Sequence, residues 1–310
     1  MIKIRDIAYA RFRAPDLDLM ERFLTDFGFT ISARRDNTLY ARGTDPAPYV
    51  HVTEQGAPGF LGLGFETESA EDLQALAEQE GLAVEEIPAL AGGQRVRMLD
   101  PNGYQIDAVF GRAAADPIPV APAELRNCGS ERRRFGARRQ LREGTPQLKR
   151  MGHAGLLVRD FRESEAWYKA RFGLLASDEI FIGDPSRVIA AFLRCDRGAT
   201  YTDHHTLVLI APPDGATGLD HVSFEVEDID DVMIGHEHLQ QAGYKHKMGA
   251  GRHILGSQVY DYWHDPWGHV LEHYADGDLL DSSEPAGHHE PGVALGSHWG
   301  SLSLAGPGED

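Results

Sequence analysis

Hydrophobic and polar positions follow the same order in two stretches of the chain, residues 1–112 and 150–274. Each stretch is predicted to contain a strand, a helix and further strands, followed by a second strand, helix and strands. In residues 221–226 (HVSFEV), His, Ser and Glu alternate with Val and Phe, which is typical of a strand with one apolar face. We therefore predict two βαβββ units in each stretch, with helices packed on the apolar faces of the strands.

Turn residues support the internal repeat. Asp-Pro-x-Gly tetrapeptides occur at 100–103 and 265–268, and each precedes a short alternating segment that contains a carboxylate. Proline fixes one backbone angle and glycine permits unusual ones, so both tetrapeptides are predicted to be turns. Two copies of one module follow from this correspondence. The matched segments are 99–107 with 264–272, 64–68 with 223–227, and 10–28 with 154–173.

The segments outside the repeat differ in composition. Residues 113–149 begin with a proline-rich stretch and continue with many arginines, which predicts a stiff, basic linker. This linker is interpreted mainly as a solvated connector, with docking on acidic surfaces or on a neighbouring subunit as the alternative. Residues 275–310 lack helical or strand periodicity and predict an irregular acidic tail that lies over a module or frays. Its histidines are expected at the surface: His288, His289 and His298.

Composition narrows the function classes. The chain has 310 residues, is 42% hydrophobic and carries a net charge of -18, which argues against nucleic acid or anionic lipid as a partner and favours a small molecule or a protein. It shows no apolar run long enough to span a membrane and no signal-peptide core, so we expect a cytoplasmic protein. Cys128 and Cys195 have no CxxC spacing, so the sequence implies neither a disulfide framework nor a thiolate metal cluster.

Three residues of the second module are candidate metal ligands. His153 begins its first predicted strand, His221 begins the strand after the midpoint, and Glu272 lies in the strand that follows the 265–268 turn. Each alone is more often a core or surface residue. Together, two imidazoles and a carboxylate resemble the facial arrangement of non-haem Fe(II) oxygenases, which leaves three positions open, whereas structural zinc fills four. The corresponding positions of the first module hold Tyr9, Gly62 and Asp107.

Residues 150–274, and more loosely 1–112, resemble the type I extradiol ring-cleaving dioxygenases of the vicinal oxygen chelate superfamily. The resemblance is carried by Gly251-x-His253, Tyr262, the 265–268 turn and Glu272, in combination with the two histidines. It implies an α+β fold of two tandem modules, each with paired βαβββ units that form a cupped mixed sheet. Asp261 departs from the pattern, because the position before the tyrosine is usually apolar.

The resemblance also implies residue roles. His153, His221 and Glu272 would hold Fe(II), occasionally Mn(II), with O2 as cosubstrate, while the N-terminal module lacks a metal site. His205 matches the acid–base histidine, and the adjacent His204 is not its equivalent, so their side chains are expected to diverge on an extended chain. His253 and Tyr262 match residues that hydrogen-bond the substrate oxygens. The implied reaction is meta cleavage of a catechol to a muconic semialdehyde-type product in aromatic catabolism, by a homo-oligomer.

Other functions stay open. A glyoxalase-like isomerase needs a fourth protein ligand, for which no second glutamate is placed, and a 4-hydroxyphenylpyruvate-type oxygenase shares the ligands but does not need His205, His253 and Tyr262. The third alternative is a metal-free protein that binds an aromatic ligand. In that case the purified protein should contain no iron, and ligand binding should survive His153→Ala. The sequence does not predict which catechol is bound or which bond beside the diol is cleaved.

Overall fold

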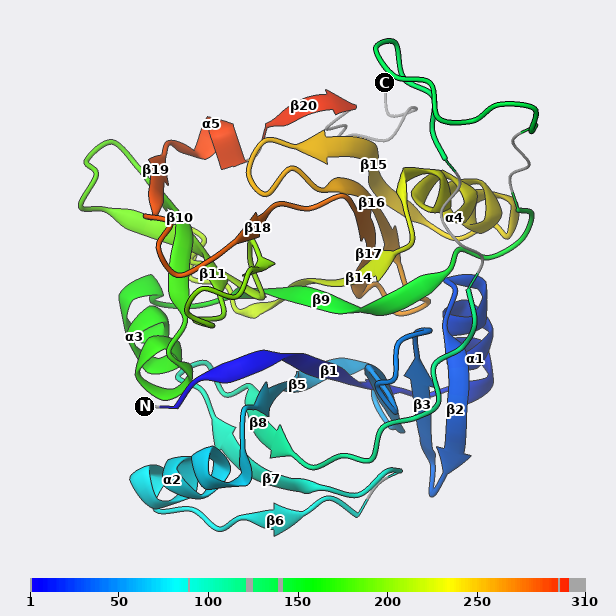
Figure 1. Ribbon diagram of the computed structural model, residues 1–310. Coiled ribbons are helices and arrows are strands. Elements are labelled where there is room, and N and C mark those ends of the chain that lie inside the picture. The colour runs from blue at the N-terminus through cyan, green and yellow to red at the C-terminus, as the bar shows by residue number, and fades with distance from the viewer. Residues whose placement is uncertain (1, 89, 121–124, 139–141, 295, 301–310) are drawn as a thin grey trace.

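Two large mixed sheets, one from each half of the chain, form the body of the protein (Figure 1). The structure is a computed structural model. It describes residues 2–88, 90–120, 125–138, 142–294 and 296–300. Within these residues, no helix is both long enough and apolar enough to cross a membrane.

The N-terminal half forms an eight-stranded sheet in the order β2-β3-β4-β1-β5-β8-β7-β6. It consists of two successive βαβββ units, as the hydrophobic pattern predicts. Asp16 and Ser69 cap the two helices by accepting hydrogen bonds from backbone N–H groups of the first turn. The elements are β1 (Ile4–Ala14), α1 (Leu17–Asp26), β2 (Thr30–Arg35), β3 (Thr38–Arg42), β4 (His51–Gln55), β5 (Gly59–Thr67), α2 (Ala70–Glu80), β6 (Glu85–Glu86), β7 (Gln94–Leu99) and β8 (Gln105–Phe110).

The C-terminal half repeats this arrangement with two further βαβββ units. Its sheet has ten strands in the order β19-β10-β11-β13-β9-β14-β17-β16-β15-β20, and β12 (Thr202–Asp203) pairs separately with β18 (Leu279–Leu280). The fold class predicted from the sequence is confirmed. The other elements are β9 (Leu148–Leu157), α3 (Phe161–Phe172), β10 (Leu175–Phe181), β11 (Val188–Arg194), β13 (Leu207–Ile210), β14 (Gly218–Val226), α4 (Ile229–Gln241), β15 (His246–His253), β16 (Val259–His264), β17 (Val270–Ala275), β19 (Gly287–His289), α5 (Pro291–Ala294) and β20 (Ser297–Gly300).

Strand register shows which residues of the two halves correspond. In the N-terminal sheet, Gly64 on β5 lies opposite Tyr9 on β1 and Asp107 on β8. In the C-terminal sheet, Ser223 on β14 lies opposite His153 on β9 and Glu272 on β17. Tyr9 therefore occupies the position in the N-terminal sheet that His153 occupies in the C-terminal sheet, and Asp107 corresponds in the same way to Glu272.

The carboxylate of the N-terminal half is neutralised by a side chain. Arg97 donates two hydrogen bonds of 2.7 Å to the two oxygens of Asp107, and the Tyr9 hydroxyl donates a third, of 2.9 Å. This bidentate guanidinium pair supplies the positive charge that a buried carboxylate requires. Both oxygens of Asp107 are thus hydrogen-bonded by side chains of the N-terminal half.

Contacts between the halves fix their relative position. One hydrophobic core extends through both, and the Phe29 and Phe224 rings pack edge to face at 4.7 Å. His273 on β17 donates a 2.7 Å hydrogen bond from Nε2 to the carbonyl oxygen of Phe27, just after α1. The Tyr168 hydroxyl on α3 donates to Asp100 in the N-terminal half at 3.1 Å. Each half therefore packs a helical region against the other.

The tail differs from the irregular segment expected from the sequence. β19 pairs in parallel with β10, and β20 pairs with β15, so the tail adds a strand to each edge of the C-terminal sheet. Figure 1 shows this sheet curving so that α5 lies between these two edge strands. Strands this short carry little periodicity of their own, because the unpaired edges of the existing sheet supply their hydrogen-bond partners. Residues 301–310 lie outside the described part of the chain.

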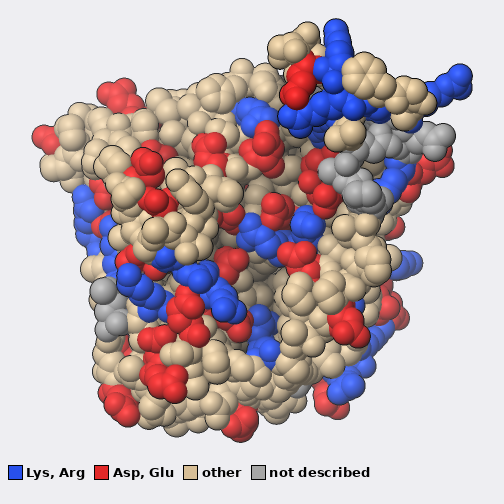
Figure 2. All heavy atoms as spheres, viewed as in Figure 1, with Lys and Arg blue, Asp and Glu red and all other residues tan. Residues whose placement is uncertain are grey.

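The described residues of the linker contain neither helix nor strand until β9 begins at Leu148, and the linker contacts α4. Arg126 donates a 2.6 Å hydrogen bond to Asp228, the N-cap residue of α4, and Arg142 donates to Asp231 in its first turn. Lys and Arg side chains gather at the upper right of Figure 2, where Figure 1 places the linker beside α4. These two contacts fit the alternative in which the basic linker docks on acidic residues, while most other described residues of the linker are exposed.

Acid sensitivity is expected from His51 on β4. Its ring is buried and stacked on Phe12 at 4.7 Å, and burial lowers its pKa from 6.5 to about 3. Between these values the unfolded chain binds a proton that the folded chain does not, so the stability contributed by neutral His51 is lost as pH falls below 6.5. We expect up to about 1.4 kcal/mol of this loss per pH unit. The free energy of unfolding, measured by urea denaturation at several pH values, should fall less steeply with decreasing pH in His51→Leu than in the wild type. Equal pH dependence in the two proteins would contradict this assignment.

Candidate metal centre

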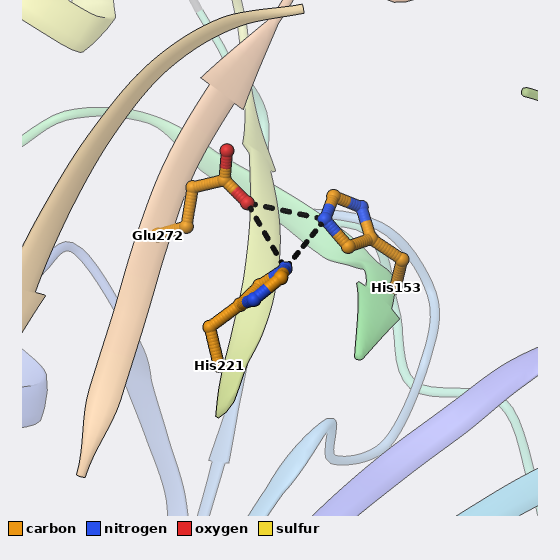
Figure 3. A group of neighbouring side chains, drawn as sticks. All are labelled: His153, His221 and Glu272. Atoms are coloured by element: carbon orange, nitrogen blue, oxygen red, sulfur yellow. Dashed lines mark hydrogen bonds and ion pairs between the residues drawn. The ribbon is translucent and has the colours of Figure 1, made fainter. Parts of the chain in front are cut away.

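Three neighbouring strands bring His153, His221 and Glu272 together, with their side chains pointing toward one another (Figure 3). His153 Nε2 lies 3.1 Å from His221 Nε2 and 3.1 Å from Glu272 Oε2, and the remaining edge, from His221 Nε2 to Glu272 Oε2, is 3.7 Å. All three residues are buried. The strand register thus places the sequence-predicted ligands at the corners of one small triangle.

The donor atoms fit a divalent cation. Facial ligands of an octahedral metal with bonds of about 2.1 Å lie about 3.0 Å apart, close to the observed edges. Neither Glu272 oxygen has a hydrogen-bond partner of good geometry within the described residues, although the side chain is fully buried. A buried carboxylate without such partners is costly unless a positive charge meets it. The arrangement of these three side chains could therefore hold a metal ion.

Protonation in this pocket also favours metal binding. Burial lowers the pKa of His153, which keeps the imidazole neutral at physiological pH. Burial alone would raise the pKa of Glu272, but the imidazoles of His153 and His253 reverse this and hold it well below its usual range. A neutral imidazole and an ionised carboxylate are the forms that bind metal ions.

Asp220 orients one of the two imidazoles. His221 Nδ1 donates a 2.6 Å hydrogen bond to Asp220 Oδ2, so Nε2 carries the lone pair that faces the triangle. Gly155 leaves room for this ring, because a Cβ atom there would lie 2.8 Å from His221 Cε1. Asp220 was not among the residues predicted from the sequence, although an acidic residue directly before a candidate ligand histidine is a recognisable signal.

His253 and Tyr262 lie beside the triad on β15 and β16. Tyr262 is the strand partner of Glu272, and its hydroxyl lies 3.0 Å from His253 Nε2. Burial raises the pKa of Tyr262 well above its usual value, so the phenol keeps its proton and can donate a hydrogen bond. His253 is positioned by stacking on the Tyr260 ring at 3.9 Å. The structure therefore brings both predicted residues next to the triad.

His205 is also close, but the expected divergence from His204 is wrong. The chain bends at His204, and the two Nδ1 atoms lie 3.0 Å apart. The His205 ring centroid lies 4.1 Å from that of His153. Because alternate side chains diverge only on extended backbone, the bend allows both imidazoles to face each other.

A hydrogen-bond chain sets the orientation of His205. His204 Nε2 donates to Asp178 Oδ2 at 2.7 Å, which leaves its Nδ1 as an acceptor for the Nδ1–H of His205. His205 then carries a lone pair on Nε2. His289 of the tail donates to the other Asp178 oxygen at 2.7 Å. Sequence reasoning missed this chain, since residues this far apart in sequence give no local signal and His289 was expected to be a surface residue.

Comparisons with known proteins agree with this geometry. Residues 150–273 match the Glyoxalase/Bleomycin resistance protein/Dioxygenase superfamily. Metapyrocatechase 2 of Cupriavidus necator is 29% identical over 92% of this chain and 85% of its own length. An iron-dependent extradiol dioxygenase of Rhodococcus jostii (strain RHA1) is 24% identical over 96% of this chain and 97% of its own length. The resemblance to extradiol dioxygenases stated from the sequence is confirmed.

Solved structures share the fold at low sequence identity. The Mn(II)-bound glyoxalase from Novosphingobium aromaticivorans has a TM-score of 0.76 at 20% identity and covers 99% of this chain and 96% of its own. Homoprotocatechuate 2,3-dioxygenase from Brevibacterium fuscum, in complex with 3,4-dihydroxyphenylacetate, has a TM-score of 0.75 at 19% identity and covers 93% and 86%. These two proteins differ in function, so the fold alone does not identify the reaction.

Proposed function

We propose that this chain, a relative of the extradiol dioxygenases within the Glyoxalase/Bleomycin resistance protein/Dioxygenase superfamily, is an Fe(II)-dependent enzyme that cleaves a catecholic ring beside its two hydroxyl groups. The observation that carries the proposal is the triangle of His153, His221 and Glu272 with the imidazole of His205 next to it. Mn(II) is the alternative metal. The proposal keeps the cytoplasmic location and the homo-oligomeric assembly expected from the sequence, and light scattering during size-exclusion chromatography measures the latter.

The role of the metal follows from its ligands. His153, His221 and Glu272 would hold Fe(II), and the bound ion supplies acidity to a chelated diol and an electron path between the ring and O2. Because these three side chains would hold the ion with three positions left open, a catechol and O2 could both reach the site.

The neighbouring side chains manage protons. Burial and the surrounding imidazoles lower the pKa of His205 well below its usual value, so the ring is neutral before substrate binds. Its Nε2 lone pair can accept the proton of an incoming catechol hydroxyl, and the resulting imidazolium can return that proton later in the cycle. The His204–Asp178 pair keeps the tautomer that this requires.

Tyr262 and His253 hold the substrate. The protonated Tyr262 hydroxyl donates a hydrogen bond to one catechol oxygen. His253 Nε2 lies 3.0 Å from this hydroxyl and can form a hydrogen bond to the same substrate oxygen. These contacts determine which hydroxyl is deprotonated first. Insertion of both oxygen atoms then gives a 2-hydroxymuconic semialdehyde or its analogue, a product typical of aromatic compound catabolism.

Two other functions remain distinguishable by experiment. A glyoxalase-type isomerase uses a fourth protein ligand, and within the described residues the candidate ligand group at this site has three members. Such an enzyme consumes no oxygen. A metal-free aromatic-binding protein would bind catechol equally well with and without iron.

Anaerobic reconstitution with Fe(II), followed by air and a panel of catechols, tests the proposal. We expect oxygen uptake equal to the catechol consumed, together with a yellow ring-fission product measured by its visible absorbance. The matched control is His153→Ala treated in the same way, which should stay colourless. An iron-loaded wild-type protein that consumes no oxygen with any dihydroxylated aromatic would exclude ring cleavage.

A further inference from the structure

Asp261, the residue that departs from the family pattern, lies at a second cluster of metal-ligating side chains. Adjacent residues of β16 point to opposite faces, so Asp261 faces α4 while Tyr262 faces the metal centre. Its carboxylate is completely buried. His236 on α4 and His246 on β15 converge on it, and the ligand atoms of all three residues lie within 4.8 Å of one another.

The separations suit a small cation. His236 Nδ1 lies 3.2 and 3.1 Å from the two Asp261 oxygens, and His246 Nε2 lies 2.8 Å from Oδ1. Nitrogen and oxygen ligands of tetrahedral zinc, with bonds of about 2.0 Å, lie about 3.3 Å apart. The two imidazole planes are nearly perpendicular, at 87°, which lets both rings approach one point from different directions.

Charge balance requires a cation at this position. Burial would raise the pKa of Asp261, but the two imidazoles lower it, so the group is ionised. Within the described residues its ion pairs are with His236 and His246, and neither partner carries a permanent charge. Either a protonated imidazole or a bound metal ion can supply this positive charge. Metal binding becomes more favourable as pH rises, because protons compete with the metal for the imidazoles.

The surroundings match a zinc site with an open position. Trp263 donates a 2.5 Å hydrogen bond from Nε1 to Asp261 Oδ2, which orients the carboxylate as outer contacts do around metal centres. The His236 and His246 side chains are 20% and 32% exposed, so water can reach a fourth position.

We propose that His236, His246 and Asp261 form a second divalent-metal site, suited to Zn(II), that cross-links α4, β15 and β16 on the face of the sheet opposite the first triad. Its ligands come from three separate elements, so the ion holds the helix against the sheet. The site is independent of the proposed ring cleavage, because it shares no residue with the first triad.

Zinc content distinguishes the two sites. The full-length chain is stripped of metal, dialysed against buffer with micromolar Zn(II), and analysed by plasma mass spectrometry. We expect about two zinc ions per chain for the wild type and about one for either His246→Gln or His153→Ala. The matched control is His238→Gln, which alters a nearby histidine of α4 that pairs with Asp26 and should leave the content at about two.

Cobalt gives a second, spectroscopic readout of the new site. In a His153→Ala background, added Co(II) should produce the visible absorption of a four-coordinate ion, and His236→Gln should remove it. Wild-type protein that binds only about one zinc ion, lost on His153→Ala, would overturn the proposal. The three residues would then be a hydrogen-bonded cluster neutralised by a proton.

Discussion

Glu272→Gln is expected to lose its iron and to cleave catechol at least about 1,000-fold more slowly than the wild type. Glutamine keeps the shape of the side chain but removes the negative charge that meets a dication at the triangle with His153 and His221. Within the described residues, Glu272 is the one carboxylate of the candidate ligand group at this site. Iron per folded chain, measured with a colorimetric chelator, and the initial rate of oxygen uptake test this expectation.

The matched control is Asp107→Asn, at the corresponding ladder position of the N-terminal sheet. There the change leaves Arg97 without its carboxylate partner, and we expect a loss of about 2 kcal/mol in the free energy of unfolding with unchanged iron content. If Glu272→Gln retained iron and turnover, the triad would not be the metal centre.

His205→Gln is expected to retain iron and to lower kcat by about 100-fold or more. Glutamine fills the space beside His153 but cannot accept a proton from catechol and later return it. The expected effect lies in turnover rather than in metal content, which separates an acid–base role from a structural one. Stopped-flow measurement of catechol deprotonation under anaerobic conditions would locate the lost step.

Variants of the supporting chain refine this prediction. His204→Gln and Asp178→Asn leave His205 in place but remove the constraint on its tautomer, so both should reduce kcat less than His205→Gln does and alter the pH profile of kcat. Normal turnover by His205→Gln would assign proton transfer to another group.

Local patterns predicted much of the fold and the candidate site. The turn at 265–268 positions the strand that carries Glu272, and alternation in residues 221–226 places His221 opposite the apolar face. These signals are local because turn chemistry and a period of two depend on neighbouring residues. The internal repeat also predicted which strands of the two halves correspond, and these strands have matching register in the structure.

Long-range pairing explains what the sequence could not predict. Asp178 meets His204 and His289 only after β10, the bend before β13 and the tail have come together. The tail strands exist because the C-terminal sheet has edges to pair with, so their own residues carry almost no strand signal. The divergence expected for His204 and His205 failed for a local reason, because it assumed an extended backbone where the chain bends at His204.

The two sheets balance the same negative charge by different means. Asp107 has its counter-charge in the guanidinium of Arg97, whereas Glu272 faces the imidazole of His153, whose pKa is lowered by burial. The N-terminal half therefore balances this charge with its own side chains, whereas under the proposed function the C-terminal half would balance it by binding a metal ion. Metal starvation should therefore weaken the molecule unevenly, with amide exchange rising around β9, β14 and β17 while the first sheet stays protected.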